Sequence, residues 1–208
     1  QYVISQIWEA TRGEALVVTG VGQHQMWAAQ NFQFHRPNGL ISSGGLGAMG
    51  FELPAALGAK VGCPQDTVWC IAGDGGIQMT IQELGTIAQE GAAVKIAIMN
   101  NGFLGMVRQW QELFYHRRYV GTQLGGPDFV MLARAYGIQG ERVTDKAQVR
   151  PAIERATVHP GPYLIDFVVE PEENVYPMVP PGASLMDFVE SPRVRQRSPA
   201  SSLGVSNI

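Results

Sequence analysis

The chain has 208 residues, of which 45% are hydrophobic and 16% charged, and this composition suits one substantial hydrophobic core. It excludes an intrinsically disordered chain, and a net charge of −3 gives no reason to expect a nucleic acid or an anionic membrane as partner. No apolar run approaches the length that spans a bilayer. We interpret Cys63 and Cys70, the only cysteines, as ordinary reduced core thiols rather than a disulfide.

Short apolar runs alternate with amphipathic stretches, which is typical of βα units and a mostly parallel sheet. The predicted strands are residues 15–19, 68–72, 94–99, 140–143 and 163–169. The predicted helices are residues 51–61, 79–89, 104–116, 128–136 and 146–157. We therefore expect an α/β domain over residues 1–187, with three layers (αβα) around a mostly parallel sheet.

Polar residues and glycines mark the ends of several predicted helices. Thr80, followed by Glu83, fits a capping box. The candidate C-terminal glycines are Gly91 and Gly137, and the candidate N-caps are Asp128 and Asp145. From residue 170 onward prolines interrupt any regular pattern, and residues 188–208 are expected to form a flexible, solvated tail that contains Arg193, Arg195 and Arg197.

Two polar turns follow consecutive apolar runs. Gly73-Asp74-Gly75-Gly76 comes directly after residues 68–72, and Asn100-Asn101 closes residues 94–99. Ligands of an open α/β sheet collect beyond the carboxyl ends of its strands, and Mg²⁺ prefers carboxylates and other hard oxygens together with phosphate oxygens. Asp74 and Asn101 are therefore candidate ligands of a metal that carries a diphosphate. Taken alone, the glycine-rich turn also fits a plain helix start that Asp74 caps.

Two further glycine-rich segments allow a close approach of the backbone to a ligand. Gly22 ends a Gly-x-Gly turn after the first strand, and Gln23 and His24 add polar side chains at the start of the next helix. This is a weak phosphate signal by itself, and His24 also fits an ordinary helix-start histidine. Gly47 and Met49 lie in a loop of glycines, where the methionine suits either packing or the support of a bent cofactor.

The run Gly105-Met106-Val107-Arg108-Gln109-Trp110-Gln111 is the most specific motif. Its Met and Trp share one face of a helix because they are four residues apart, and such a pair is more often core than a binding surface. The run nonetheless resembles a signature of acetohydroxyacid synthase (acetolactate synthase) large subunits. Residues 47–51 (Gly-x-Met-Gly-Phe) and 178–183 resemble the same family, and the likeness extends from about residue 6 to residue 188.

The resemblance implies the C-terminal thiamin-diphosphate-binding domain, with the corresponding fold, of an acetolactate synthase catalytic subunit. It implies that Asp74, Asn101 and the main-chain carbonyl of Phe103 ligate Mg²⁺. It also implies a substrate channel lined by Met106 and Trp110, which favours 2-ketobutyrate as second substrate, and an active-site lid at residues 178–183.

Several residues are expected from this resemblance to contact the cofactor. Met49 would hold thiamin diphosphate in its bent form, and the carbonyl of Gly47 would meet the amino group of the pyrimidine. The full set implied is Gly22, Gln23, His24, Gly47, Met49, Gly73, Asp74, Gly75, Gly76, Asn101, Phe103, Gly105 and Met106.

The family likeness carries further expectations about substrates and partners. It implies pyruvate and 2-ketobutyrate as substrates, FAD in a full-length parent, a homodimer or tetramer, a regulatory small subunit, and a location in the cytoplasm, a plastid or a mitochondrion. In the family an N-terminal domain supplies the glutamate that activates the cofactor, and no segment here resembles that domain. Because Gln1 is not a methionine, we expect an excised or processed piece that is inactive alone.

Other interpretations of the chain stay open. The same fold serves pyruvate oxidase, glyoxylate carboligase and related 2-ketoacid enzymes. The chain also fits a non-catalytic module that binds Mg–thiamin diphosphate, or one subunit of a split enzyme. An anabolic and a catabolic parent are equally compatible with the residues.

Two positions depart from the family pattern. Glu52 follows Phe51 where the family usually has glycine or another small residue. Gly76 follows Gly75 where a larger residue is common. Neither change removes a ligand, and we expect both to loosen a turn or to alter the local charge beside the cofactor.

Overall fold

The computed structural model describes residues 1–180 and 182–191, and the chain divides into two compact units, Gln1–Glu173 and Asn174–Ile208. The second unit contains a short 3₁₀ helix, η1 (Leu185–Asp187), and an isolated antiparallel bridge between Met178 and Val189. Most of the tail expected over residues 188–208, including its three arginines, lies outside the described residues. All the strands and α-helices of the described residues belong to the first unit.

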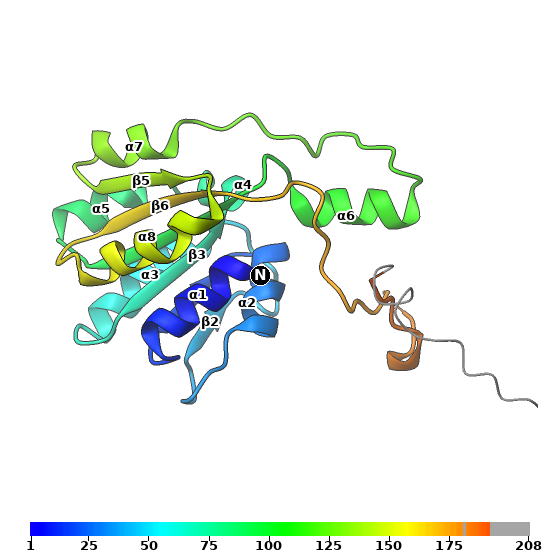
Figure 1. Ribbon diagram of the computed structural model, residues 1–208, viewed down its shortest axis with the longest axis horizontal. Helices are drawn as coiled ribbons and strands as arrows, with labels where there is room; N and C mark the ends of the chain where they lie inside the picture. Colours follow the sequence, from blue (N-terminus) through cyan, green and yellow to red (C-terminus); the bar gives the residue numbers. More distant parts are fainter. Residues whose placement is uncertain (181, 192–208) are drawn as a thin grey trace, which may run out of the picture. The chain divides into compact units, whose positions relative to one another are not determined.

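The first unit is a parallel six-stranded sheet with helices on both faces (Figure 1). The strands are β1 (Leu16–Thr19), β2 (Leu40–Ser42), β3 (Val68–Gly73), β4 (Val94–Asn100), β5 (Gln139–Val143) and β6 (Tyr163–Val168). The helices are α1 (Tyr2–Thr11), α2 (Gln23–Asn31), α3 (Glu52–Gly62), α4 (Asp74–Ile77), α5 (Glu83–Gln89), α6 (Gly105–Phe114), α7 (Phe129–Ala135) and α8 (Lys146–Val158).

The sheet has the strand order β2-β1-β3-β4-β6-β5. Helices α1, α2 and α8 cover one face, whereas α3, α5 and α7 cover the other. The strands β3 and β4 are buried on both faces, which explains why their sequences are largely apolar without alternation, interrupted only by Lys95 and closed by Asn100 in β4. The expected three-layer α/β fold is therefore confirmed.

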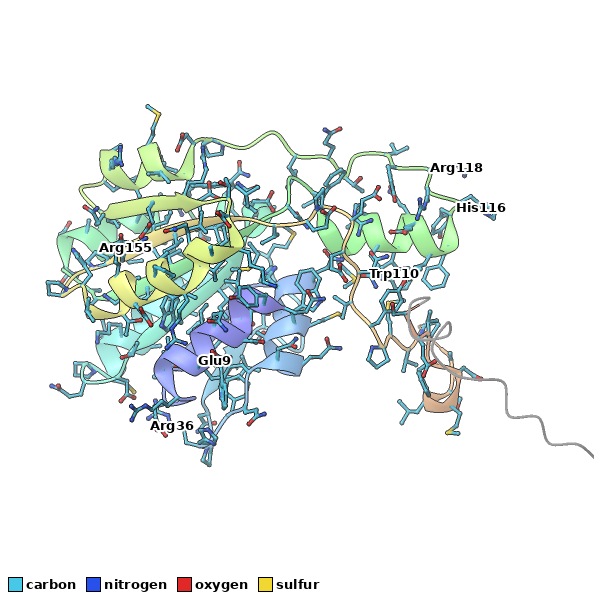
Figure 2. The ribbon with its side chains drawn as sticks, in the orientation of Figure 1. Glu9, Arg36, Trp110, His116, Arg118 and Arg155 are labelled. Carbon is cyan, nitrogen blue, oxygen red and sulfur yellow. The ribbon has the colours of Figure 1, made fainter. Side chains whose placement is uncertain are left out.

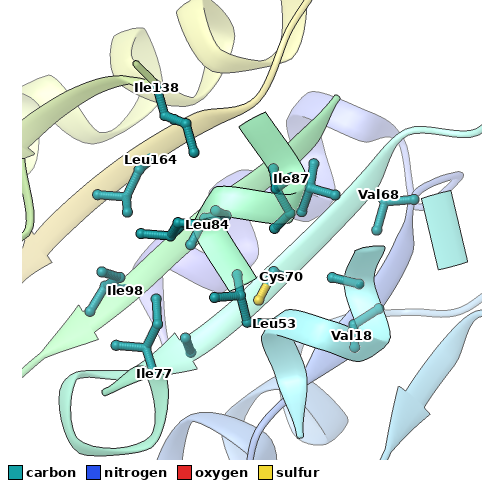
Figure 3. Close-up of a cluster of buried hydrophobic side chains, with 14 of the residues drawn as sticks. Val18, Leu53, Val68, Cys70, Ile77, Leu84, Ile87, Ile98, Ile138 and Leu164 are labelled. Carbon is teal, nitrogen blue, oxygen red and sulfur yellow. The ribbon is translucent and has the colours of Figure 1, made fainter. Parts of the chain in front are cut away.

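The core on the α3–α5–α7 face is a continuous cluster of aliphatic side chains (Figure 3). Leu53 of α3 and Leu84 and Ile87 of α5 are fully buried there against Val18, Cys70 and Ile98 of the central strands. Each such side chain contributes roughly 1.5–3 kcal/mol when it is removed from water. This packing holds α3 against the ends of β1 and β3, where the candidate site lies.

Helix α1 and strand β2 were not expected from the sequence, and neither were the short helices α4 and η1. Helix α1 has apolar residues at Val3, Ile4 and Ile7, which are buried at helical spacing, but its Gln1 cap makes no side-chain hydrogen bond. Strand β2 has only three residues, all half-buried, at the edge of the sheet. Among the described residues, no helix combines the length and apolar character that a membrane span requires.

The predicted helix ends were mostly confirmed. Asp145 accepts from the amide of Ala147, and Asp128 likewise accepts from two amides at the start of α7. Gly91 and Gly137 follow α5 and α7 with φ of 59° and 75°, the left-handed conformation in which glycine carries no Cβ penalty.

Three of the smaller expectations were wrong. The capping box does not form, because α5 begins at Glu83 after Gln82 and the Thr80 hydroxyl donates instead to the carbonyl of Gly50 at 2.8 Å. The expected helix start at residue 79 is four residues too early, because α5 begins at Glu83, and the short helix α4 that directly follows β3 was not predicted. Cys70 is buried as expected, but Cys63 is exposed and so is not a core thiol; both are free.

Candidate functional site

The site lies where the direction of the chain connections reverses. From β1 the chain passes to β2 on one side, and from β3 it passes to β4 on the other, while β1 and β3 are neighbours. In open α/β sheets this reversal leaves a crevice at the carboxyl ends of the strands. A cavity of about 320 Å³ lies there, lined by the turns after β1, β3 and β4.

Every residue expected to contact the cofactor lines this one cavity. The set is Gly22, Gln23, His24, Gly47, Met49, Gly73, Asp74, Gly75, Gly76, Asn101, Phe103, Gly105 and Met106. These residues come from segments far apart in the sequence, and the parallel register explains their meeting, because Gly73 of β3 lies opposite Met99 of β4.

The turns after β3 and β4 are joined by a hydrogen bond. Asp74 is the first residue of α4, and its Oδ2 accepts from the amide of Gly102 at 2.9 Å. Asn101 Oδ1 accepts from the amide of Phe103 at 3.0 Å and, as an amide oxygen, retains a second lone pair. The candidate carboxylate and the candidate amide oxygen are thus fixed at one end of the cavity.

The main-chain carbonyl of Phe103, the third candidate ligand, belongs to an isolated antiparallel bridge with Gln123. The two hydrogen bonds of this bridge run from Leu104 N to Thr122 O at 2.7 Å and from Leu124 N to Gly102 O at 2.8 Å. Neither bond uses the carbonyl of Phe103. The bridge therefore holds the loop without occupying that oxygen.

Asp74 is only 4% exposed, and burial raises the pKa of its carboxyl group to about 6, while the amides of Gly102 and Gly75 act in the opposite direction. The negative charge of Asp166 contributes to the same rise in the pKa of Asp74. A carboxylate that burial disfavours in its charged form gains from a cation beside it. The electrostatics of the turn therefore suit a divalent metal.

Of the two asparagines, only Asn101 lines the cavity. Asn100 instead donates to Asp166 Oδ1 at 2.9 Å. Asn101 Nδ2 donates to Gln23 Oε1 at 3.4 Å, and Gln23 Nε2 donates in turn to Gln109 Oε1 at 2.9 Å. This relay of hydrogen bonds fixes the orientation of the side-chain amides of Asn101 and Gln23.

Glycine is required at position 105 for this relay. A Cβ atom there would lie 2.7 Å from Asn101 Nδ2 and closer still to Gln23 Oε1. Any side chain at residue 105 would therefore displace the amides of Asn101 and Gln23.

His24 brings an orphaned polar atom to the cavity. The ring is buried, and its Nε2 has no hydrogen-bond partner among the described residues. Burial lowers the pKa of His24 to about 4, so the imidazole is neutral at neutral pH. A Cβ atom on Gly73 would lie 2.9 Å from His24 Cε1, which shows how closely the ring packs on the turn.

The apolar wall of the cavity includes Met49 and Met106. Gly47 lies in the same loop as Met49 and has a φ of 67°, a conformation that favours glycine. Trp110, which was expected beside Met106 in a substrate channel, does not line this cavity. Trp110 lies further along α6 (Figure 2). The centroid of its ring is 5.2 Å from that of Phe114.

Sequence reasoning missed several contributors to the site, of which four bear on its geometry. Met99 and Val169 line the cavity as residues at or just beyond the ends of β4 and β6, a position that the strand prediction itself indicates. Trp27 also lines it, and its indole Nε1 lacks a hydrogen-bond partner among the described residues. Its spacing of one helical turn from Gln23 was the available signal. Gln109, fully buried behind Gln23, left no such signal.

The residues of the cavity fit a metal diphosphate. The donor set combines a carboxylate, an amide oxygen and a main-chain carbonyl, which are hard oxygen ligands suited to Mg²⁺. The neutral imidazole of His24 and the glycine backbone supply hydrogen-bond donors and space for phosphate oxygens. Fold and site together define a cofactor-binding domain that holds a diphosphate at the carboxyl edge of a parallel sheet.

Comparison with known families agrees with this class. Residues 20–167 match the model of the thiamine pyrophosphate enzyme, C-terminal TPP binding domain. That match covers well over half of the chain, and the chain belongs to this family. Thiamin diphosphate (thiamine pyrophosphate) is accordingly the diphosphate cofactor of this domain family.

Among curated proteins, the chain is similar to acetolactate synthases. The chain is 49% identical over 189 residues to the acetolactate synthase isozyme 2 large subunit of Escherichia coli, which covers 90% of this chain and 34% of the relative. It is 50% identical over 194 residues to the acetolactate synthase large subunit of Corynebacterium glutamicum (90% and 31%). It is 48% identical over 197 residues to the chloroplastic acetolactate synthase 1 of rice, Oryza sativa subsp. japonica (91% and 31%). The chain thus spans about a third of the length of these relatives.

Proposed function

We propose that the chain is the Mg–thiamin-diphosphate-binding part of an acetolactate synthase catalytic subunit. The whole enzyme would decarboxylate pyruvate and join the remaining two-carbon unit to a second pyruvate or to 2-ketobutyrate, at the entry to branched-chain amino acid biosynthesis. The observation that carries the proposal is the hydrogen bond from Gly102 N to Asp74 Oδ2, which joins the two ligand-bearing turns in one cavity. The similarity to acetolactate synthase large subunits supports the choice of reaction.

Three oxygens of the chain are proposed to hold Mg²⁺: the Asp74 carboxylate, Asn101 Oδ1 and the carbonyl of Phe103. The bond from Gly102 N keeps Asp74 oriented, and Gln23 keeps the Nδ2 side of Asn101 turned away from the metal. When bound, thiamin diphosphate supplies the electron sink that decarboxylation of a 2-ketoacid requires. The protein contributes position and electrostatics.

Other side chains are proposed to orient the organic part of the cofactor. The neutral His24 ring can donate to a phosphate oxygen, and its low pKa keeps the site free of an additional positive charge. Gly47 and Met49 would support the bent cofactor, and Met106 would exclude water near the reacting carbon. Trp110 would take part in substrate selection only further along α6, since it lies outside the cavity.

The proposal assigns other components to the full-length enzyme. These are FAD, the glutamate that activates the cofactor, a homodimer or tetramer, and a regulatory small subunit. A location in the cytoplasm, a plastid or a mitochondrion belongs to the same proposal. We expect the 208-residue chain alone to form no acetolactate from pyruvate, and acetolactate production by the purified chain would contradict this part.

Calorimetric titration with thiamin diphosphate tests the site directly. The chain is titrated with and without Mg²⁺, beside an Asp74→Ala variant and an Asp128→Ala control at the exposed cap of α7. We expect binding that needs Mg²⁺, that is lost in Asp74→Ala and that is retained in the control. If neither the chain nor the full natural polypeptide that carries it binds the cofactor, the proposed function is wrong.

A further inference from the structure

Glu52 carries a fully buried carboxyl group. Its side chain is 0% exposed, and both Oε1 and Oε2 lack a partner among the described residues. Such a group is costly, because a carboxylate removed from water needs compensating hydrogen bonds or charges. Burial accordingly raises the pKa of Glu52 to about 6, an effect that the nearby amides of Glu52 and Gly50 only partly oppose.

The carboxyl group lies between the turns that follow β1 and β3. A Cβ atom on Gly76 would lie 2.7 Å from Glu52 Oε1, and the three nearest atoms to it all belong to Glu52. A Cβ atom on Gly20 would lie 2.5 Å from Glu52 Cδ, and again the three nearest atoms are those of Glu52. The side chain therefore fills the space that two missing side chains leave.

Backbone conformation gives no other reason for these two glycines. Neither Gly20 nor Gly76 has a φ in the left-handed region. Gly76 lies within α4, where alanine is the better helix former. Among the described residues, Glu52 is the close neighbour that a side chain at position 76 would meet.

Glu52 has little freedom to move away. A glutamate at the surface would swing its carboxyl group aside, but this one is enclosed, with Gly20 against its other side. Its neighbour Leu53 is fully buried in the core cluster with Cys70 and Ile77 (Figure 3). The charge of Glu52 adds to the rise in the pKa of Cys70, which places that thiol near the carboxyl group.

This position connects Glu52 to the cofactor site without direct contact. Glu52 does not line the cavity, whereas Gly76 and its neighbours Asp74 and Gly75 do, and the turn after β1 contributes Val21 and Gly22. We propose that Glu52 is a positioning residue that supports both cofactor-binding turns from behind, and that it forms an obligate pair with Gly76. The proposal rests on the proposed function only in its claim about the cofactor.

A double-mutant cycle tests the pairing without any ligand. Thermal unfolding is followed for the full chain, Glu52→Ala, Gly76→Ala and the double variant, with Gly58→Ala as a control because a Cβ atom there meets nothing within 4 Å. We expect Gly76→Ala alone to lower the Tm by about 4 °C or more. In the Glu52→Ala background the same change should leave the Tm unchanged or raise it. Equal shifts in both backgrounds would overturn the pairing.

Cofactor affinity tests the positioning role. Calorimetry with Mg²⁺ and thiamin diphosphate is run on the full natural polypeptide that carries this chain, well below the Tm of each variant. We expect Glu52→Ala to weaken binding about tenfold, and Glu52→Gln, which keeps the shape, to stay within about threefold of wild type. A purely structural role would lower the Tm of Glu52→Ala and leave the affinity of the folded protein unchanged, and that result overturns the role.

The two failures are distinguishable. If the wild-type protein binds the cofactor and Glu52→Ala binds it equally well, the positioning role fails while the proposed function stands. If the wild-type protein does not bind the cofactor, the proposed function and the positioning role both fail. The unfolding cycle still decides, in that case, whether Glu52 and Gly76 are a pair.

Discussion

Asp74 and Glu52 are two buried carboxyl groups beside the same glycine-rich turn, yet their surroundings differ. Asp74 lines the cavity and accepts a hydrogen bond from Gly102, whereas Glu52 is outside the cavity and has no partner for either oxygen among the described residues. Burial raises the pKa of both groups to about 6. A raised pKa therefore does not by itself indicate a metal ligand. We propose different roles for the two groups because Asp74 lines the cavity and Glu52 does not.

The same chemical change at both carboxyl groups gives the sharpest test of this difference. Asp74→Asn removes the charge of a proposed metal ligand, and we expect the affinity for thiamin diphosphate in the presence of Mg²⁺ to fall about 100-fold or more. Glu52→Gln removes a charge that lies outside the cavity, and the affinity should stay within about threefold of wild type. Calorimetry on both variants measures the contrast, which equal losses would refute.

The pH dependence of the free energy of unfolding gives a second test of the difference between Glu52 and Asp74. The unfolded Glu52 titrates near 4.5 and the folded one near 6. Below 4.5 both states hold the proton and burial costs nothing extra, whereas above 6 the folded state carries a buried charge at a cost of about 2 kcal/mol. Relative to wild type, Glu52→Gln should therefore gain about 2 kcal/mol in free energy of unfolding between pH 4 and pH 8.

Urea unfolding at the two pH values measures this gain. The matched control is Glu14→Gln, which changes an exposed glutamate by the same atoms. A difference between Glu52→Gln and wild type that is the same at pH 4 and pH 8 would show that the carboxyl group is solvated or paired. The comparison of the two carboxyl groups would then lose its physical basis.

Substitution of His24, which lines the cavity, should lower cofactor affinity less than substitution of Asp74. Its Nε2, which has no hydrogen-bond partner among the described residues, is proposed to donate to a phosphate oxygen. Hydrogen bonds to charged groups contribute about 1.5–3 kcal/mol. His24→Phe keeps a ring over Gly73 but removes the donor, so the affinity for Mg–thiamin diphosphate should fall about tenfold. His35→Phe, at an exposed histidine, is the control. Equal affinity of the two variants in calorimetry would assign His24 to packing alone.

Much of this site followed from local patterns in the sequence. The strands β3 and β4 are apolar runs closed by polar residues, so Asp74 and Asn101 were predictable from strand ends and the geometry of parallel sheets. Asp145 and Gly137 were predictable for the same reason, since their signals lie within a few residues of the element they end.

The features that escaped prediction depend on contacts between distant segments. Gln109 accepts a hydrogen bond from Gln23, which lies 86 positions earlier in the sequence. The short strand β2 forms by pairing with β1. Glu52 stood out only as a departure from a family pattern, whereas Gly76 was such a departure and was also predicted to contact the cofactor. Their packing against each other became visible in the structure, because no local pattern relates a helix start to a turn on another strand.

The smallest expected effect is at Asp145, where a substitution should lower global stability without changing cofactor affinity. Asp145 caps α8 through the amide of Ala147 and lies outside the cofactor cavity. Asp145→Ala should lower the free energy of unfolding by about 1 kcal/mol, while Asp145→Asn, which keeps an acceptor, should lower it by a few tenths at most. Neither variant should change the affinity for Mg–thiamin diphosphate. If Asp145→Ala weakened cofactor binding as much as Glu52→Ala does, the effect of Glu52→Ala on affinity would be a general consequence of lost stability rather than of its place behind the two turns.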